Sequence, residues 1–215
     1  LLGHPCRVLA LVVVDLVLGD DLEYRECRLR LGRIAEDAGV SMRPCRYGDT
    51  AVVPLLGWYD YSFGMPEDDL YMMWMDYRAC SWPEGFDVRR IAAHFLAMNP
   101  AALPEPAARV VTFSHFLPRI DLIPSFVPPA MRTLDPVLGS DGIEHQLRAL
   151  GSRLHVYGHS HINRRVVIDG VTYVNSAFGY PQETSIAGRR LLDLEVALDP
   201  AGTEAPAVDT GAQGG

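Results

Sequence analysis

The alternation of short apolar segments with helical segments constrains the fold of this chain more than any other feature of its sequence. Residues 51–56, 109–114 and 154–157 are short and apolar, as buried strands are. Residues 87–98 and 141–150 lie between them and repeat apolar side chains every three or four positions, as amphipathic helices do. Strands that alternate with helices in this way predict an α/β fold.

The segments on either side of this central pattern add a helix and a hairpin. Residues 21–38 repeat apolar side chains at helical spacing, and Gly39 follows as a helix stop. Residues 165–168 and 171–175 are strand-like, and the Asp-Gly pair between them is the strongest two-residue hairpin signal. We therefore expect a further helix before the central pattern and a hairpin after it.

The remaining stretches are less regular. Residues 57–83 form a long insertion rich in aromatic side chains, which we expect to pack as local core; the alternative is a lid or stacking platform for a substrate. Residues 1–20 are apolar and rich in valine, and residues 189–198 alternate weakly, so each predicts at most one strand. Residues 199–215 are small, polar and rich in glycine, which predicts a disordered tail.

The charge balance excludes several classes of protein. The 215 residues carry a net charge of −8 at pH 7, and all 19 basic residues are arginine. An acidic chain does not bind a phosphate backbone by counterion release, so we expect no role in coating nucleic acid. Because lysine is absent, the chain has neither a Schiff-base lysine nor the lysine of a phosphate-binding P-loop.

The cysteines and the hydropathy pattern predict a cytoplasmic protein with no membrane partner. Four scattered cysteines form no C-x-x-C pair, which excludes a zinc ribbon and a thioredoxin-type site and fits buried thiols in a reducing compartment. The longest apolar stretch, residues 8–18, is interrupted by Asp15 and is too short to span a bilayer.

Three of the seven histidines follow the ends of predicted strands. Gly158-His159-Ser160-His161 comes directly after residues 154–157, and His115 follows residues 109–114. Ligand sites in α/β proteins gather at the carboxyl ends of strands, and neutral imidazole is a common ligand for transition metals. These histidines are therefore candidate metal ligands; the alternative for each is a polar loop side chain that binds no ligand.

Longer stretches around these histidines resemble the calcineurin-like metallophosphoesterases, and in particular a bacterial branch of that family. The resemblance rests on four segments: L-L-G-W-Y-D-Y-S-F (55–63), V-V-T-F-S-H-F-L-P-R (110–119), L-H-V-Y-G-H-S-H-I-N (154–163) and I-D-G-V-T-Y-V-N-S-A-F-G-Y-P-Q-E (168–183). It covers about residues 21–198. It implies a partial domain of this family over residues 1–198, of which residues 1–20 are uncertain, followed by the tail.

The resemblance implies a fold and a reaction. The family fold is a four-layer α/β/β/α sandwich that carries two divalent metal ions (Mn, Fe or Zn) at its strand ends. By this resemblance His115 and His159 ligate one ion, and His161 ligates the other. The reaction is hydrolysis of a phosphate ester, in which a hydroxide that bridges the two ions attacks phosphorus. Neutral histidines hold the ions without cancelling the positive charge that an anionic substrate meets.

The first part of the chain departs from the family pattern. That pattern begins with D-x-H, G-D-x-x-D and G-N-H, which supply the bridging aspartate and an asparagine ligand, and none of them is matched here. Residues 19–23 mimic the second motif only loosely, and His4 is a weak candidate for the catalytic histidine. We therefore expect a truncated member without its N-terminal strands, which binds at most one ion, has little phosphatase activity and self-associates through its open sheet edge.

Two other functions stay open on the sequence. A remnant could hold a single metal ion on its three histidines without catalysis. A plain interaction domain could carry the same histidines with no ligand at all. Arg119, four residues after His115, either contacts the substrate phosphate or, as we expect more strongly, is a structural arginine.

Overall fold

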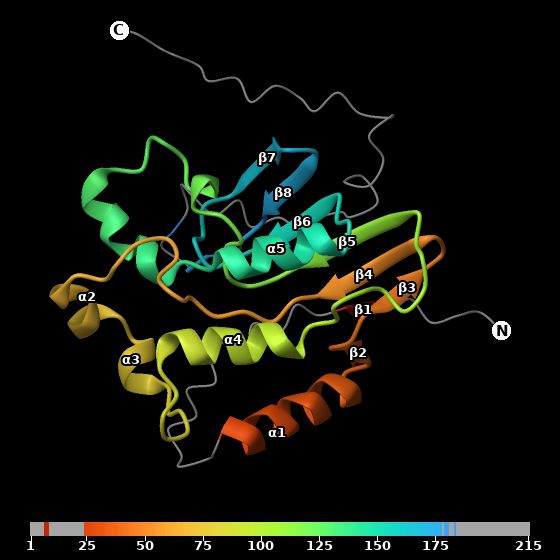
Figure 1. The fold of residues 1–215 in the computed structure, drawn as a ribbon, viewed down its shortest axis with the longest axis horizontal. Coiled ribbons are helices and arrows are strands. Elements are labelled where there is room, and N and C mark those ends of the chain that lie inside the picture. Colours follow the sequence, from red (N-terminus) through yellow and green to blue (C-terminus); the bar gives the residue numbers. More distant parts are fainter. Residues whose placement is uncertain (1–6, 9–23, 178, 181–182, 184–215) are drawn as a thin grey trace, which may run out of the picture.

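The computed structural model describes residues 7–8, 24–177, 179–180 and 183 of the chain (Figure 1). Several sequence predictions fall outside these described residues. They are the weak strand at 189–198, the tail at 199–215, most of the segment at 1–20, and the candidate His4.

The described elements alternate strand and helix as the sequence predicts. In chain order they are β1 (Arg7–Val8), α1 (Tyr24–Asp37), β2 (Val40–Ser41), β3 (Cys45–Tyr47), β4 (Thr50–Pro54), α2 (Asp68–Met73), α3 (Asp76–Ala79), α4 (Val88–Met98), β5 (Arg109–Phe113), the 3-10 helices η2 (Ile120–Leu122) and η3 (Pro129–Val137), α5 (Asp141–Ala149), β6 (Leu154–Tyr157), β7 (Arg164–Ile168) and β8 (Val171–Asn175).

A six-stranded mixed sheet organises the molecule. Its strand order is β3-β4-β5-β6-β8-β7, and the four central strands run parallel, while β3 and β7 pair antiparallel at the two edges. A separate parallel pair joins β1 to β2. The predicted hairpin is the β7–β8 pair, and both turn residues, Asp169 and Gly170, have positive φ as a tight turn of this kind requires. The α/β class is therefore confirmed.

One face of the sheet and two helices form the main core (Figure 1). α4 contributes Ile91, Ala92 and Phe95, and α5 contributes Ile143 and Leu147, all of them buried. They pack with the side chains of one sheet face, which include Ala51, Val53, Val110, Tyr157, Val171 and Tyr173. The register explains why these side chains share a face, because paired residues of parallel strands point to the same side.

The opposite face of the sheet carries a second, smaller buried cluster. It consists of Val111, Leu154 and Val174, which are neighbours on β5, β6 and β8. Val111 pairs with Leu154 in register, and Leu154 in turn pairs with Thr172. The central strands are thus apolar on both faces, which is typical of parallel sheets covered on both sides.

The ends of the two core helices follow from their capping residues. Asp87 caps α4, because its side chain accepts a hydrogen bond from Arg90 N at 2.8 Å. α5 is capped by Ser140, whose hydroxyl oxygen accepts from Gly142 N at 3.1 Å. The spacing of Asp141 and Glu144 resembles a capping box in the sequence, but that interpretation is wrong, because Ser140 is the N-cap and Glu144 bonds Tyr173 and Arg148 instead.

Glu144 lies in a charged network that ties α5 to the β7–β8 hairpin. Tyr173 Oη donates to its carboxylate at 2.7 and 2.8 Å, and Arg148 Nε donates at 2.8 Å. Arg148 also donates to the carbonyl oxygen of Asp169 in the hairpin turn at 2.7 Å. The carboxylate is mostly buried, with 13% of its side chain exposed, so its partners compensate the loss of water.

The aromatic insertion is largely local core, as the sequence predicts. Trp58 and Tyr59 are buried, and Trp58 packs on Trp82, Phe95 and Phe116 with ring centroids 5.1 to 6.2 Å apart. α2 and α3 also belong to the insertion, and α2 exposes two methionines, Met72 and Met73. Among the described residues, no helix combines the length and the apolar character needed to cross a membrane.

Gly139 is required by a close backbone approach. It forms an isolated bridge with Leu117, and a Cβ atom at position 139 would overlap the Leu117 carbonyl oxygen. We expect Gly139→Ala to lower the free energy of unfolding by about 2 kcal/mol or more, since backbone atoms must move to make room. Denaturant unfolding measures the change. Gly32→Ala is the matched control, because no atom lies within 4 Å of its added Cβ and alanine favours a helix interior by about 0.5–1 kcal/mol. Equal effects of the two changes would contradict this account.

Candidate metal centre

The carboxyl ends of β5 and β6 bring the first two predicted ligands together. Phe113 pairs with Val156 in the parallel register, and Ser114 N continues the ladder by donating to Val156 O at 3.0 Å. Gly158 N then donates to His115 O at 3.0 Å. The segments that follow β5 and β6 therefore leave the sheet side by side, and the first carries His115 while the second carries His159.

His115 and His159 are in direct contact. His115 Nε2 lies 2.7 Å from His159 Nδ1, and the ring centroids are 4.5 Å apart. His159 Nε2 lies 3.1 Å from the carbonyl oxygen of Val137, which only accepts, so Nε2 carries the proton of His159. It follows that His159 Nδ1 has a free lone pair and that His115 Nε2 donates to it.

Both imidazoles are neutral at physiological pH. Burial lowers the pKa of His115 to about 2, with the nearby His159 and His161 adding to the effect. Burial likewise lowers the pKa of His159 to about 4, helped by His161 and opposed by the bond to Val137 O. Neutral imidazole is the protonation state that binds a metal ion.

His161 is near this pair but has a different partner. Its Nδ1 lies 2.9 Å from Glu183 Oε2, and its ring contacts Tyr180 at a centroid distance of 5.1 Å. Tyr180 N also bonds the Glu183 carboxylate, which lowers the pKa of that carboxyl. Because Glu183 bonds Nδ1 of His161, Nε2 is the nitrogen that a ligand would use.

The donor set fits a metal ion in part. Two nitrogens that share a tetrahedral ion at 2.0–2.1 Å lie about 3.4 Å apart, so the 2.7 Å pair needs to open by well under 1 Å. The bond from His159 to the Val137 carbonyl is the kind of outer partner that orients a metal-binding imidazole. Within residues 24–177, 179–180 and 183, however, no three histidine, cysteine or acidic side chains are grouped closely enough to hold an ion.

Aromatic rings enclose His159. Phe116 lies 4.7 Å from it and Trp74 lies 5.6 Å from it, measured between ring centroids. Trp74 comes from the end of α2, and its indole nitrogen donates to Asp76 at 2.9 Å. The sequence gives no signal for the Trp74 contact beyond the general density of aromatic residues in this insertion.

His155 lies in a buried polar cluster beneath His115. Its Nε2 is 3.1 Å from Ser114 Oγ, and its Nδ1 is 2.8 Å from Thr112 Oγ1. The Ser114 hydroxyl donates to Phe116 O at 2.6 Å, so His155 Nε2 is the donor in its bond to Ser114. The cluster thereby fixes the backbone on both sides of His115.

Arg119 is structural, as we expected more strongly from the sequence. It bonds Asp121 at 2.8 and 2.9 Å and contacts Glu144 and Asp169 at 3.3 Å. The bond to Asp121 and then that to Glu144 raise its pKa further above its ordinary value, and burial opposes this shift. Its guanidinium is therefore committed to carboxylates of the protein rather than to a substrate phosphate.

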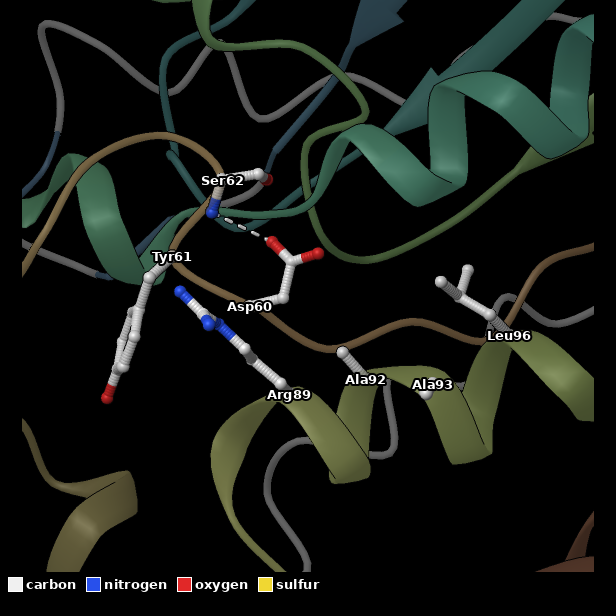
Figure 2. Close-up of a pocket in the computed structure, with 7 residues that line it drawn as sticks. All are labelled: Asp60, Tyr61, Ser62, Arg89, Ala92, Ala93 and Leu96. Atoms are coloured by element: carbon white, nitrogen blue, oxygen red, sulfur yellow. Dashed lines mark hydrogen bonds between the residues drawn. The ribbon is translucent and has the colours of Figure 1, made fainter.

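A pocket of about 350 Å³ lies between α4 and the segment that follows β4. Figure 2 shows its lining residues: Asp60, Tyr61, Ser62, Arg89, Ala92, Ala93 and Leu96. Asp60 accepts from Ser140 Oγ at 2.8 Å and from Ser62 N at 2.9 Å, so its carboxylate is used to anchor this segment to α5. None of the three candidate histidines lines the pocket.

Comparison with known proteins bears on the fold. No family model matches the chain, and no curated protein matches it. The crystal structure of phosphopantetheinyl hydrolase (PptH) from Mycobacterium tuberculosis is similar, with a TM-score of 0.53 and 22% sequence identity over 74% of this chain. The chain spans 62% of the length of that structure. Another solved structure reaches a TM-score of 0.36 at 17% identity over 71% of this chain and 52% of its own, which is too distant to support an argument.

The burial of His155 predicts a pH dependence of stability. Burial lowers its pKa to about 3, below the ordinary value of 6.5, so the unfolded chain takes up a proton that the folded chain does not. Stability is fully present above about pH 6.5 and falls as the pH drops toward 3, with His155 contributing a slope of up to about 1.4 kcal/mol per pH unit.

The variant His155→Gln tests this assignment. It should be less stable at pH 7, yet its free energy of unfolding should depend on pH less steeply between 6 and 4, by about one proton. Urea unfolding at a series of pH values gives both slopes. A variant slope equal to that of the wild type would show that His155 already carries a proton in the fold.

Proposed function

We propose that this chain is part of a metal-dependent hydrolase of phosphate esters that belongs to the calcineurin-like metallophosphoesterases. The observation that carries the proposal is the 2.7 Å contact between His115 Nε2 and His159 Nδ1 at the carboxyl ends of two parallel strands. Two neutral imidazoles with converging nitrogens suit a transition metal, and their position suits a ligand site of an α/β sheet.

The proposal includes a four-layer α/β/β/α sandwich for the complete domain. α4 and α5 cover one face of the six-stranded sheet, and the cluster of Val111, Leu154 and Val174 makes the opposite face apolar as well. Two facing sheets bury such a cluster between them, and the burial of Val111, Leu154 and Val174 is compatible with that arrangement. The fold likeness to PptH at a TM-score of 0.53 supports a related architecture.

The site residues have separate roles in this proposal. His115 and His159 hold one divalent ion, and His161, oriented by Glu183, is positioned for a second. A bound divalent ion supplies Lewis-acid polarisation of the phosphoryl oxygens and lowers the pKa of a water molecule. The chain's own contribution is to keep the imidazoles neutral by burial and to keep bulk water from one side of the pair with Phe116 and Trp74.

The substrate in this proposal is a phosphate ester whose alcohol part has apolar character. The ring of Trp74 contacts His159, and Trp74 directly follows the exposed Met72 and Met73 of α2 in the chain. The name of the similar structure, phosphopantetheinyl hydrolase, is compatible with such an ester, because it denotes hydrolysis of a phosphorylated group.

A second candidate function is metal binding without catalysis. It is favoured because, among the described residues, the hydrogen bonds shown for the His115–His159 pair reach the Val137 carbonyl oxygen and no carboxylate. Two like-charged ions need a bridging oxygen ligand to lie close together. Binding and turnover measured on the same samples separate the two functions.

The test compares wild-type protein with His115→Ala and His159→Ala. We expect the wild type to bind Zn²⁺ or Mn²⁺ in a calorimetric titration, and either substitution to weaken binding at least tenfold, because each removes half of the nitrogen pair. Hydrolysis of an aryl phosphate with Mn²⁺ is followed on the same proteins. The matched control is His145→Ala, since His145 is exposed on α5 and lies outside the pair.

Each outcome decides between the functions. Metal binding and turnover that are both lost in the two variants support the hydrolase. Binding without turnover in the wild type supports a metal site that this chain does not use in catalysis by itself. Metal binding that is unchanged in His115→Ala and His159→Ala contradicts both, because the ion would then lie elsewhere.

A further inference from the structure

The segment that carries His159 and His161 has an unusual backbone. Both histidines have positive φ, 63° and 55°, in the left-handed region that side chains other than glycine rarely adopt. Ser160 N donates to Gly158 O at 2.7 Å, which closes a three-residue turn around His159. With positive φ at its centre this is the rarer and more strained form of γ-turn.

Such a conformation persists only where the surroundings impose it. The left-handed region is energetically unfavourable for residues other than glycine, so two such residues within three positions need specific contacts to hold them. Residues 158–163 connect β6 to β7, and β8 lies between these two strands in the sheet. The connection therefore crosses the end of β8, whose last residue is Asn175.

Asn175 is placed directly beneath this crossing. It pairs in register with Tyr157 on β6 and with Arg164 on β7, the residues that flank the connection. Its side chain is buried, with 3% of the residue exposed. Nδ2 donates to Ser160 Oγ at 2.9 Å and to Gly158 O at 3.2 Å, which uses both of its hydrogens.

The two acceptors of Asn175 are the points that define the strained turn. Gly158 O is the carbonyl that closes the turn around His159, and Ser160 lies between the two left-handed histidines. Ser160 Oγ also accepts from Ile162 N at 3.4 Å, so the contact with Asn175 extends to the far side of His161. A side chain with one donor, or with none, cannot hold both points.

We propose that Asn175 is a positioning residue that holds the 158–162 turn in its strained form and so presents His159 and His161 at the end of the sheet. It acts through these histidines and does not contact a metal or a substrate itself. The inference rests on the proposed function only in assigning a metal site to the two histidines. The role of Asn175 in holding the turn does not depend on that function. A sequence signal exists, because an asparagine ends the strand-like segment V-T-Y-V-N.

The experiment has one readout that needs no metal. Backbone NMR of wild type, Asn175→Ala and Ser160→Ala reports φ at His159 and His161 from chemical shifts and couplings. We expect Asn175→Ala to move both histidines out of the left-handed region. Ser160→Ala, which loses only one of the two Asn175 bonds, should move them partly and keeps the test open if the first variant unfolds.

Asn99→Ala is the matched control. Asn99 is a half-buried amide that, like Asn175, bridges distant segments, here through Leu56 and Gln146, but it lies outside the turn. We expect it to lower stability and to leave the signals of residues 158–162 unchanged. Unchanged φ at both histidines in Asn175→Ala and in Ser160→Ala would overturn the inference, as would equal shifts in Asn99→Ala.

The second readout is Zn²⁺ affinity, measured by calorimetry. Loss of an outer partner of this kind weakens metal binding by about 10–100-fold, and we expect that loss in Asn175→Ala but not in Asn99→Ala. If the wild type binds no Zn²⁺ while the turn still changes selectively in Asn175→Ala, the proposed metal site fails and the positioning role stands. Wild-type affinity retained in Asn175→Ala would remove the link between the turn and the site.

Discussion

The parallel pairing of β5 with β6 determines the position of everything at the candidate site. The ladder of hydrogen bonds continues past the two strands, because Ser114 N donates to Val156 O and Gly158 N donates to His115 O. The segments that follow β5 and β6 therefore leave the sheet at the same level. His115 and His159 can then meet at 2.7 Å. A slip of one residue would turn one of the two histidines to the other side of the sheet.

Burial and hydrogen bonding act together on this pair. The surroundings of Phe116 and Trp74 exclude water, which favours the neutral imidazoles, and the Val137 carbonyl fixes which nitrogen of His159 carries the proton. The buried cluster of His155, Ser114 and Thr112 supports the same region from within the sheet. The result is a pair of neutral imidazoles on a rigid base, in which His159 Nδ1 offers its lone pair and His115 Nε2 offers one once its proton moves to Nδ1.

Periodicity predicted the regular elements because burial imposes it. Ile143 and Leu147 of α5 and the strands of the central sheet are apolar where they face the core, so their pattern could be read from the sequence. The meeting of His115 with His159 followed from the rule that strand ends collect at one sheet edge. The α5 cap, in contrast, could not be read from the Asp141–Glu144 spacing, because Ser140 takes the cap position and the distant Tyr173 bonds Glu144.

Contacts that depend on irregular segments had no signal of this kind. Trp74 reaches His159 from a long insertion, and His161 turns toward Glu183, 22 residues away. The left-handed turn at His159 and His161 could not be predicted from the sequence, because neither strained position is a glycine. These features depend on tertiary packing, and neither spacing nor propensity encodes them locally.

A crystal structure of the chain with Mn²⁺ or Zn²⁺, with anomalous diffraction recorded at the metal edge, tests the central claim most directly. The account predicts an anomalous peak between β5 and β6, about 2.0–2.2 Å from His115 Nε2 and from His159 Nδ1, with the two nitrogens separated further than 2.7 Å. A peak at another place in the molecule, with the two imidazoles still bonded to each other, would contradict it.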